Sequence, residues 1–200
     1  MFELTERGGG VLGGIILLSF AAWVLIVWKW LRLQRDVEKG FGWAERVVAC
    51  VRAGRRAEAI EICRGRANLI GRFVLQGLEQ KDPGRFFDRK HLDPYLRGEF
   101  TELRRHLPLI AVLATLAPLL GLLGTILGMV QTFGAITVHG TRETGLIADG
   151  ISQALLTTQA GLVTALPILV LHRWLSSRAR RCAEAARLYG KKIEAAWSGR

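Results

Sequence analysis

The sequence predicts an all-α integral membrane protein with three transmembrane helices, whose long helices extend into a cytoplasmic helical domain. Three apolar blocks, roughly Val11 to Leu31, Leu109 to Val138 and Ile147 to Leu171, carry this prediction. Each reaches or exceeds the ~20 residues that a helix needs to cross a bilayer. Buried core helices of soluble proteins usually stop near 10 to 14 apolar residues, so that alternative is much the weaker one.

The distribution of charge predicts how the chain is oriented in the membrane. Of 28 Lys and Arg residues, 18 lie between Lys29 and Leu107 and 8 follow His172, so that only Arg7 and Arg142 fall elsewhere. Cationic segments stay on the cytoplasmic side, which predicts a periplasmic N-terminus and a cytoplasmic C-terminus. The net charge of +11 is thereby explained without nucleic acid, and it favours attraction to anionic phospholipids.

The apolar blocks and the charges together divide the chain into seven parts. Glu3 and Glu6 precede the first block in place of a cationic leader, so we expect a retained span and not a cleaved signal peptide. The parts are an extracytoplasmic N-terminus (1–10), transmembrane helix 1 (11–31), a cytoplasmic helical domain (32–107), transmembrane helix 2 (108–138), a periplasmic loop (139–148), transmembrane helix 3 (149–172) and a cytoplasmic C-terminal helix (173–200).

The first span carries residues typical of a membrane interface near its inner end. Trp23, Trp28 and Trp30 surround Lys29 there. Indole rings and a lysine ammonium commonly lie at headgroup depth, so we expect these side chains to anchor a lipid-facing helix.

The segment from 32 to 107 has the apolar spacing of short helices. The sequence predicts one helix ending at Gly54, a second ending at Gly65 and a third capped by Asn68. A fourth is expected to begin near Arg85 and to run into the second span, with an interruption at Asp93-Pro94.

Residue types that carry enzyme chemistry are scattered along this chain. No phosphate-binding loop, nucleophile elbow or carboxylate pair is present. Cys50, Cys63 and Cys182 lack metal-ligand spacing. We expect their thiols to stay reduced and to serve in packing. His91 and His106 are isolated, and exposed polar histidines are expected. The sequence therefore predicts no enzyme, no cofactor and no metal site.

The second span places small residues and threonines on one face. Pro118, Gly121, Thr125, Gly128 and Thr132 follow one another in steps of three and four. Small residues permit close helix approach, and the hydroxyl groups can bond across an interface or line a polar path. Spacing alone favours packing, with each threonine bonded to its own helix, and leaves the pathway open.

The third span carries a matching stripe and continues beyond the membrane. The stripe consists of Ala154, Thr158, Gly161 and Ala165. The outer half of the span also carries four polar residues, Ser152, Gln153, Thr157 and Gln159. Such groups are costly in hydrocarbon, so we expect this face to be buried against protein or water. The helix is predicted to continue past His172 as an amphipathic, cationic tail.

Ionisable residues are absent from both of these spans. No Asp, Glu, Lys, Arg or His lies between Leu107 and Val138, or between Gly150 and Leu171. A proton path through a membrane generally needs a group that can be protonated. If this protein conducts protons, another subunit must supply that group.

Two motif blocks, LAPLLGLLGTILGMVQTF and GISQALLTTQAGLVTALP, resemble the MotA/TolQ/ExbB proton channel family. The likeness in layout covers roughly residues 11 to 190, and it is strongest to short ExbB-type members that serve TonB-dependent uptake. It implies a ring-forming subunit, a homopentamer, around the single spans of two ExbD-like proteins. An aspartate on the ExbD-like span would carry the proton, and the resulting motor would energise a TonB-like protein.

The resemblance also assigns roles to residues. Thr125 and Thr158 match the family's pore threonines and would offer hydroxyl groups to the partner aspartate. Gln153 stands where many relatives have glutamate and cannot titrate, and Asp149, one turn outward, is a weak substitute. The expected pathway residues are Thr125, Thr158, Thr132 and Gln153, and the expected packing residues are Pro118, Gly121, Gly128, Gly161 and Pro167.

Two alternatives stay open at this point. The pore motif is shared with TolQ-like subunits of the Tol-Pal envelope system, so the motif alone does not choose between the two machines. A membrane scaffold that conducts nothing would use the same threonine stripes only for helix packing.

Overall fold

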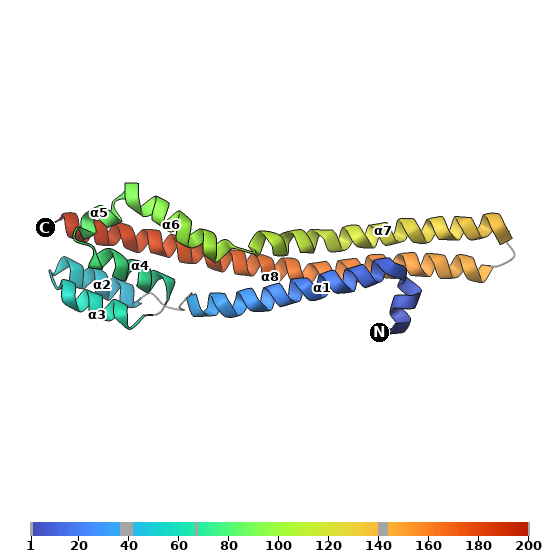
Figure 1. Cartoon of the computed structure of the whole chain (residues 1–200), viewed down its shortest axis with the longest axis horizontal. Helices are drawn as coiled ribbons and strands as arrows, with labels where there is room; N and C mark the ends of the chain where they lie inside the picture. The colour runs from blue at the N-terminus through green and yellow to red at the C-terminus, as the bar shows by residue number, and fades with distance from the viewer. Residues whose placement is uncertain (1, 37–41, 67, 140–143, 200) are drawn as a thin grey trace. The chain divides into compact units, whose positions relative to one another are not determined.

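Helices account for all the regular structure in the described part of the chain. The computed structural model describes residues 2–36, 42–66, 68–139 and 144–199, and it shows eight helices and no strand within those ranges (Figure 1). They are α1 (Phe2–Asp36), α2 (Gly42–Arg52), α3 (Arg56–Arg64), α4 (Leu69–Glu79), α5 (Pro83–Phe87), α6 (Arg89–Arg104), α7 (Leu107–His139) and α8 (Thr144–Ser198). The loop charges Arg142 and Glu143 lie outside the described residues.

Three helices have the length and apolar composition needed to cross a membrane. The qualifying stretches are Gly10–Gln34 in α1, Leu107–Gly134 in α7 and Ile147–Ser198 in α8. The predicted class, an all-α integral membrane protein, is thereby confirmed. Helix α8 is continuous over 55 residues, which confirms that the third span runs past His172 without a break.

The chain divides into two compact units, of which the first is the apolar one. It consists of Met1–Trp28 and His106–Arg173, and the second of Lys29–Arg105 and Trp174–Arg200. In the apolar unit, Leu18 of α1 forms a buried cluster with Ala117 of α7 and Ala165 of α8. Leu113 and Leu120 of α7 pack against this cluster. Large apolar side chains cover the opposite side of α1, including Leu17 and Phe20, and are exposed as lipid contact requires.

The second unit is a helical domain whose predicted helices α2, α3 and α4 are present. Asn68 caps α4 by accepting a hydrogen bond from the backbone N–H of Gly71 at 2.7 Å, as its position before an apolar run predicts. Gly54 ends the first of these helices with a φ of 82°, a conformation that costs glycine little. Cys50, Cys63 and Cys182 are buried and free of disulfide bonds.

The break between α6 and α7 differs from the prediction. Helix α6 passes through Pro94, and the chain breaks instead at Arg105 and His106. Pro94 lies in the second turn of α6, where its missing N–H removes only one backbone hydrogen bond. His106 adopts a φ of 69° and packs edge-on against the ring of Trp28, with 5.1 Å between ring centroids. It is half-buried, and the expectation of an exposed histidine was wrong.

Lys29 also differs from expectation. Its side chain is 1% exposed, whereas Trp23, Trp28 and Trp30 are each about two-fifths exposed. Lys29 follows the buried Ile26 by three residues, so it lies on the side of α1 that protein buries. Trp28 and Trp30 lie about 100° to either side of it, and the Trp28 ring contacts His106. The lysine therefore lacks the exposure expected of an interfacial anchor, and anchoring by the tryptophans stays a prediction.

Candidate functional site: a threonine flank beside the α7–α8 seam

Small residues bring the backbones of α7 and α8 into contact. We call this contact the α7–α8 seam, formed by Ala114, Ala117, Gly121, Gly124, Gly128 and Thr132 of α7 with Ala154, Thr157, Gly161 and Ala165 of α8, all of them buried. A Cβ atom on Gly161 would lie 2.6 Å from the carbonyl oxygen of Ala117, and one on Gly121 would lie 3.0 Å from that of Thr157. Backbone atoms cannot rotate away, so a side chain at Gly161 would force the helices apart, and one at Gly121 would require a shift of a few tenths of an ångström.

Two adjacent threonines of α8 bond to one carbonyl of α7. The hydroxyl of Thr158 donates to the carbonyl oxygen of Gly121 at 3.1 Å. Thr157, 1% exposed, donates to Ala154 at 2.8 Å and approaches the same Gly121 oxygen at 3.5 Å. The seam is thus closed by hydrogen bonds between helices as well as by close packing, as is common for threonine in membranes.

The threonines of α7 bond within their own helix. Thr125 donates to the carbonyl of Leu122 at 2.7 Å and is half-buried, and Thr132 donates to Gly128 at 2.9 Å and is buried in the seam. Both hydroxyl hydrogens are engaged locally, as the packing interpretation expects. The oxygen of Thr125 keeps acceptor capacity toward the edge of the seam.

Thr125 and Thr158 lie on the same side of the seam, away from α1. Each residue turns a helix by about 100°, which places Thr125 about 140° from Leu120, a residue on the α1 side. The contacts of Gly121 with Thr158 and of Gly128 with Ala154 show that α7 and α8 run antiparallel. In an antiparallel pair, residues displaced in the same rotational sense from the seam fall on one side.

We call this side the threonine flank, defined by Thr125 and Thr158 with their neighbours Met129 and Leu162. Met129 and Leu162 follow the two threonines by four residues and are 38% and 49% exposed. Two half-buried threonines therefore lie beside exposed apolar side chains on this flank. Within the described chain, nothing charged lies beside them on α7 or on the part of α8 before His172, apart from Asp149 near the start of α8.

The other sequence-predicted site residues occupy different surroundings. Gln153 is half-buried and lies about 140° around α8 from Thr158, on the opposite side of the seam. Pro118 is half-buried at the edge of the seam, and Pro167 is exposed. The structure thus brings Thr125 and Thr158 together and does not bring Gln153 to them.

Sequence reasoning missed two members of the seam, Thr157 and Gly124, and the close contact of Gly150 just beyond it. A Cβ atom on Gly124 would overlap the hydroxyl oxygen of Thr157, and one on Gly150 would overlap that of Thr132. The usable signal was the alternation of steps of three and four from Ala154 through Thr157 to Gly161, a seam of period 3.5.

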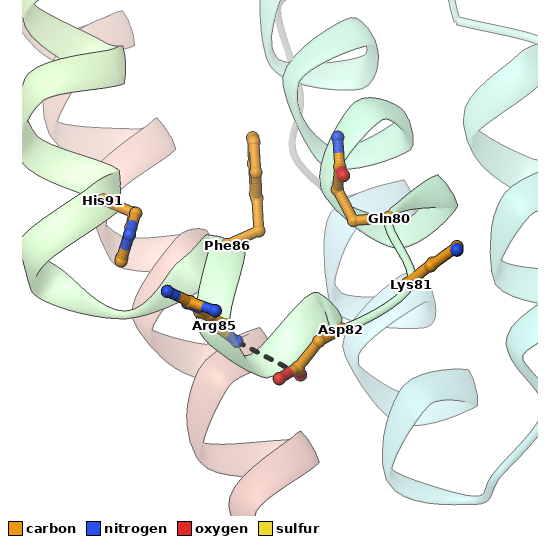
Figure 2. Close-up of a pocket in the computed structure, with 6 residues that line it drawn as sticks. All are labelled: Gln80, Lys81, Asp82, Arg85, Phe86 and His91. Atoms are coloured by element: carbon orange, nitrogen blue, oxygen red, sulfur yellow. Dashed lines mark hydrogen bonds between the residues drawn. The ribbon is translucent and has the colours of Figure 1, made fainter.

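The helical domain offers weaker candidates for a site. A cleft of about 300 Å³ lies at the turn from α4 to α5. Figure 2 shows the residues that line it, Gln80, Lys81, Asp82, Arg85, Phe86 and His91. Asp82 already caps α5, because its carboxylate accepts from the backbone N–H of Arg85 at 3.3 Å (Figure 2). The described residues contain no group of three His, Cys, Asp or Glu side chains that could hold a metal ion.

Cys63, the cysteine of α3, is expected to react slowly as a nucleophile. Burial raises the pKa of the Cys63 thiol to about 12, from an ordinary value of 9.0. The reactive thiolate form is therefore scarce at neutral pH.

Comparison with known proteins points to one family. The model of the MotA/TolQ/ExbB proton channel family matches residues 66–187. The putative biopolymer transport protein ExbB-like 1 of Synechocystis sp. is 31% identical over 195 residues, which cover 94% of this chain and 75% of that protein. ExbB of Aquifex aeolicus is 40% identical over 79 residues, 40% of this chain and 53% of that protein. TolQ of Haemophilus influenzae is 32% identical over 83 residues, 42% of this chain and 36% of that protein.

Proposed function

This chain belongs to the MotA/TolQ/ExbB proton channel family, and we propose that it is the ring-forming subunit of a proton-driven motor in the bacterial inner membrane. The observation that carries the proposal is the threonine flank. Thr125 and Thr158 present two hydroxyl groups on a surface that the chain itself leaves uncovered. A polar spot on an apolar membrane surface is costly unless a partner meets it.

The partner of this flank must bring the titratable group. Helix α7 has no carboxylate, and α8 has none between Gly150 and Leu171. The chain therefore offers half of a proton path. We propose an ExbD-like protein with one span, whose aspartate is protonated from the periplasm, passes the threonine flank and releases its proton to the cytoplasm. Several copies of this chain, a pentamer by family likeness, would enclose two such spans.

In this mechanism the threonines hold the carboxyl group in its crossing position. A protonated carboxyl group can donate to the hydroxyl oxygen of Thr158 or Thr125, each of which already donates its hydrogen to a backbone carbonyl. Movement of the protonated group past the ring is then converted into rotation or a shift of the ExbD-like pair. That motion would energise a TonB-like protein for transport across the outer membrane.

The topology of the proposal places the helical domain in the cytoplasm. The cationic segments predict a periplasmic N-terminus and a cytoplasmic C-terminus. Protons would thus enter from the side of the α7–α8 connection and leave toward the side of the helical domain.

Two threonine substitutions test the pathway. Thr158→Val and Thr125→Ala each remove a hydroxyl group and are expected to reduce proton flux at least tenfold in vesicles that contain the purified complex. Thr137→Val is the matched control, because Thr137 is exposed and bonds to Gly134 at 2.7 Å in the same way as Thr125 bonds to Leu122. Normal flux in both pathway variants, with the complex assembled, would defeat the assignment.

A TolQ-like role in the Tol-Pal system is a second candidate, supported by the likeness to the TolQ protein. Complementation distinguishes the two: a TonB-type subunit restores uptake through the outer membrane, and a TolQ-type subunit restores envelope integrity during division. A scaffold without conduction is the third candidate. It expects no proton flux and no co-purified single-span partner with a membrane aspartate.

A further inference from the structure

Helix α6 and the C-terminal part of α8 line a basic cleft in the helical domain. The proposed proton path does not use this cleft. Its volume is about 510 Å³, in the range of ligand sites. Its lining residues are Leu96, Arg97, Phe100, Thr101 and Arg104 of α6 with Arg180, Ala183, Glu184 and Arg187 of α8. We call it the arginine cleft.

The charges of the arginine cleft follow from helix periodicity. On α6, Arg97 and Arg104 are seven residues apart, and on α8 the same spacing separates Arg180 and Arg187. Two turns of helix return a side chain to the same face, so each helix contributes a pair of guanidinium groups to the cleft. Glu184 is the one carboxylate among the lining residues that the structure describes, and those residues together carry three net positive charges.

The floor of the cleft is rigid and apolar. Leu96 is 1% exposed and Phe100 is 7% exposed, so both are fixed by packing under the arginines. The described lining therefore presents guanidinium groups from two helices above one apolar floor. Guanidinium groups bind phosphate oxygens by paired, charge-assisted hydrogen bonds, which makes them the preferred phosphate ligands in proteins.

From these observations we infer that the arginine cleft binds a phosphate-bearing anion. The same chemistry could come from the headgroup of an anionic phospholipid or from a soluble phosphate compound. The smaller cleft beside α5 is a poorer phosphate site, because its described lining has one guanidinium group, that of Arg85, beside the carboxylate of Asp82. The inference does not depend on proton conduction.

Protection of arginines from phenylglyoxal tests the inference on the full chain in its purified, delipidated complex. Modification at each arginine is measured by mass spectrometry of peptides. The probes are inorganic phosphate, short-chain phosphatidylglycerol and, as a zwitterionic control, short-chain phosphatidylcholine. Arg46 and Arg52 of α2 are exposed, lie outside the cleft and serve as internal references.

The expected result is at least fivefold slower modification of the cleft arginines than of the references in the presence of phosphate or phosphatidylglycerol. Protection by phosphatidylglycerol alone assigns a lipid source, and equal protection by phosphate assigns a soluble one. The variant Arg97→Gln/Arg180→Gln should need at least tenfold more probe to protect Arg104 and Arg187. The control variant Arg46→Gln/Arg52→Gln loses the same charge and should behave as the parent.

Four results would overturn the inference. They are no protection by either anion, equal protection of Arg46 and Arg52, equal protection by phosphatidylcholine, and cleft arginines that are unreactive before any probe is added. The last would show that a second copy of the chain covers the cleft.

Discussion

Replacing Gly161 by alanine tests whether the backbones of α7 and α8 are truly in contact. The new Cβ atom would lie 2.6 Å from the carbonyl oxygen of Ala117 and 3.2 Å from the Cα atom of Gly121. Both neighbours are backbone atoms, so the helices must separate by several tenths of an ångström. Overpacking of this kind costs about 1–3 kcal/mol, and separation also weakens the bond from Thr158 to Gly121, worth about 0.6 kcal/mol in membranes. We expect a loss of about 2–3 kcal/mol in the free energy of unfolding.

The assay is reversible unfolding of the full chain in mixed micelles, followed by far-UV circular dichroism. Gly134→Ala is the matched control on α7, because nothing lies within 4 Å of the position that its new methyl group would occupy, and it should leave stability unchanged or slightly higher. The double variant Gly161→Ala/Ala117→Gly should be at least as unstable as the single one, since the clash is with a carbonyl group and not with the alanine methyl, and glycine in a helix adds a loss of about 1 kcal/mol. A Gly161→Ala protein as stable as the parent would refute the close seam, and rescue by Ala117→Gly would refute the stated cause.

Two further predictions concern other parts of the chain. Gly150→Ala should be destabilising, and adding Thr132→Ala should recover most of the loss, because the new methyl group would overlap the hydroxyl oxygen of Thr132 and lie 3.3 Å from its Cβ atom; the same unfolding assay decides, and no recovery would contradict the contact. The raised pKa of Cys63, about 12 against 9.0, means that the folded state holds the thiol proton more tightly than the unfolded chain. The contribution of the protonated Cys63 thiol to the free energy of unfolding is therefore full below pH 9, and it is lost as the pH rises from 9 to 12. Thiol titration of the folded protein at pH 8 should leave Cys63 unmodified, whereas fast labelling would contradict its burial.

Much of the fold follows from patterns that act over short distances. The spans, the positions of α2 to α4 and the Asn68 cap depend on apolar periodicity and local hydrogen bonding, which a sequence displays directly. The glycine stripes also showed that α7 and α8 approach closely. The sequence could not show which of two adjacent threonines lies in the seam, because a rotation of about 100° separates Thr157 from Thr158 and either fits a stripe of small residues.

The remaining differences arise where tertiary contacts override local preference. His106 holds a positive φ, which is unfavourable for a residue with a Cβ atom, while its ring packs against Trp28 from a distant part of the chain. Lys29 is buried, although an isolated span would hold its ammonium at the headgroups. Both departures depend on which side of α1 meets protein, and a single sequence does not specify that side.

The hydrogen bonds of the threonine flank bear on which form of a partner carboxyl group it would accept. The hydroxyl hydrogens of Thr125 and Thr158 are directed to the carbonyl oxygens of Leu122 and Gly121, so only their oxygen lone pairs are free to face the flank. Lone pairs accept from a protonated carboxyl group and repel a carboxylate, which would first have to compete for the hydrogens. Because a charge in an apolar membrane surface is costly as well, both effects favour the neutral acid at this depth. In the proposed motor, the flank would thus select the proton-loaded partner for passage, and the discharged partner would be stable only where water reaches it.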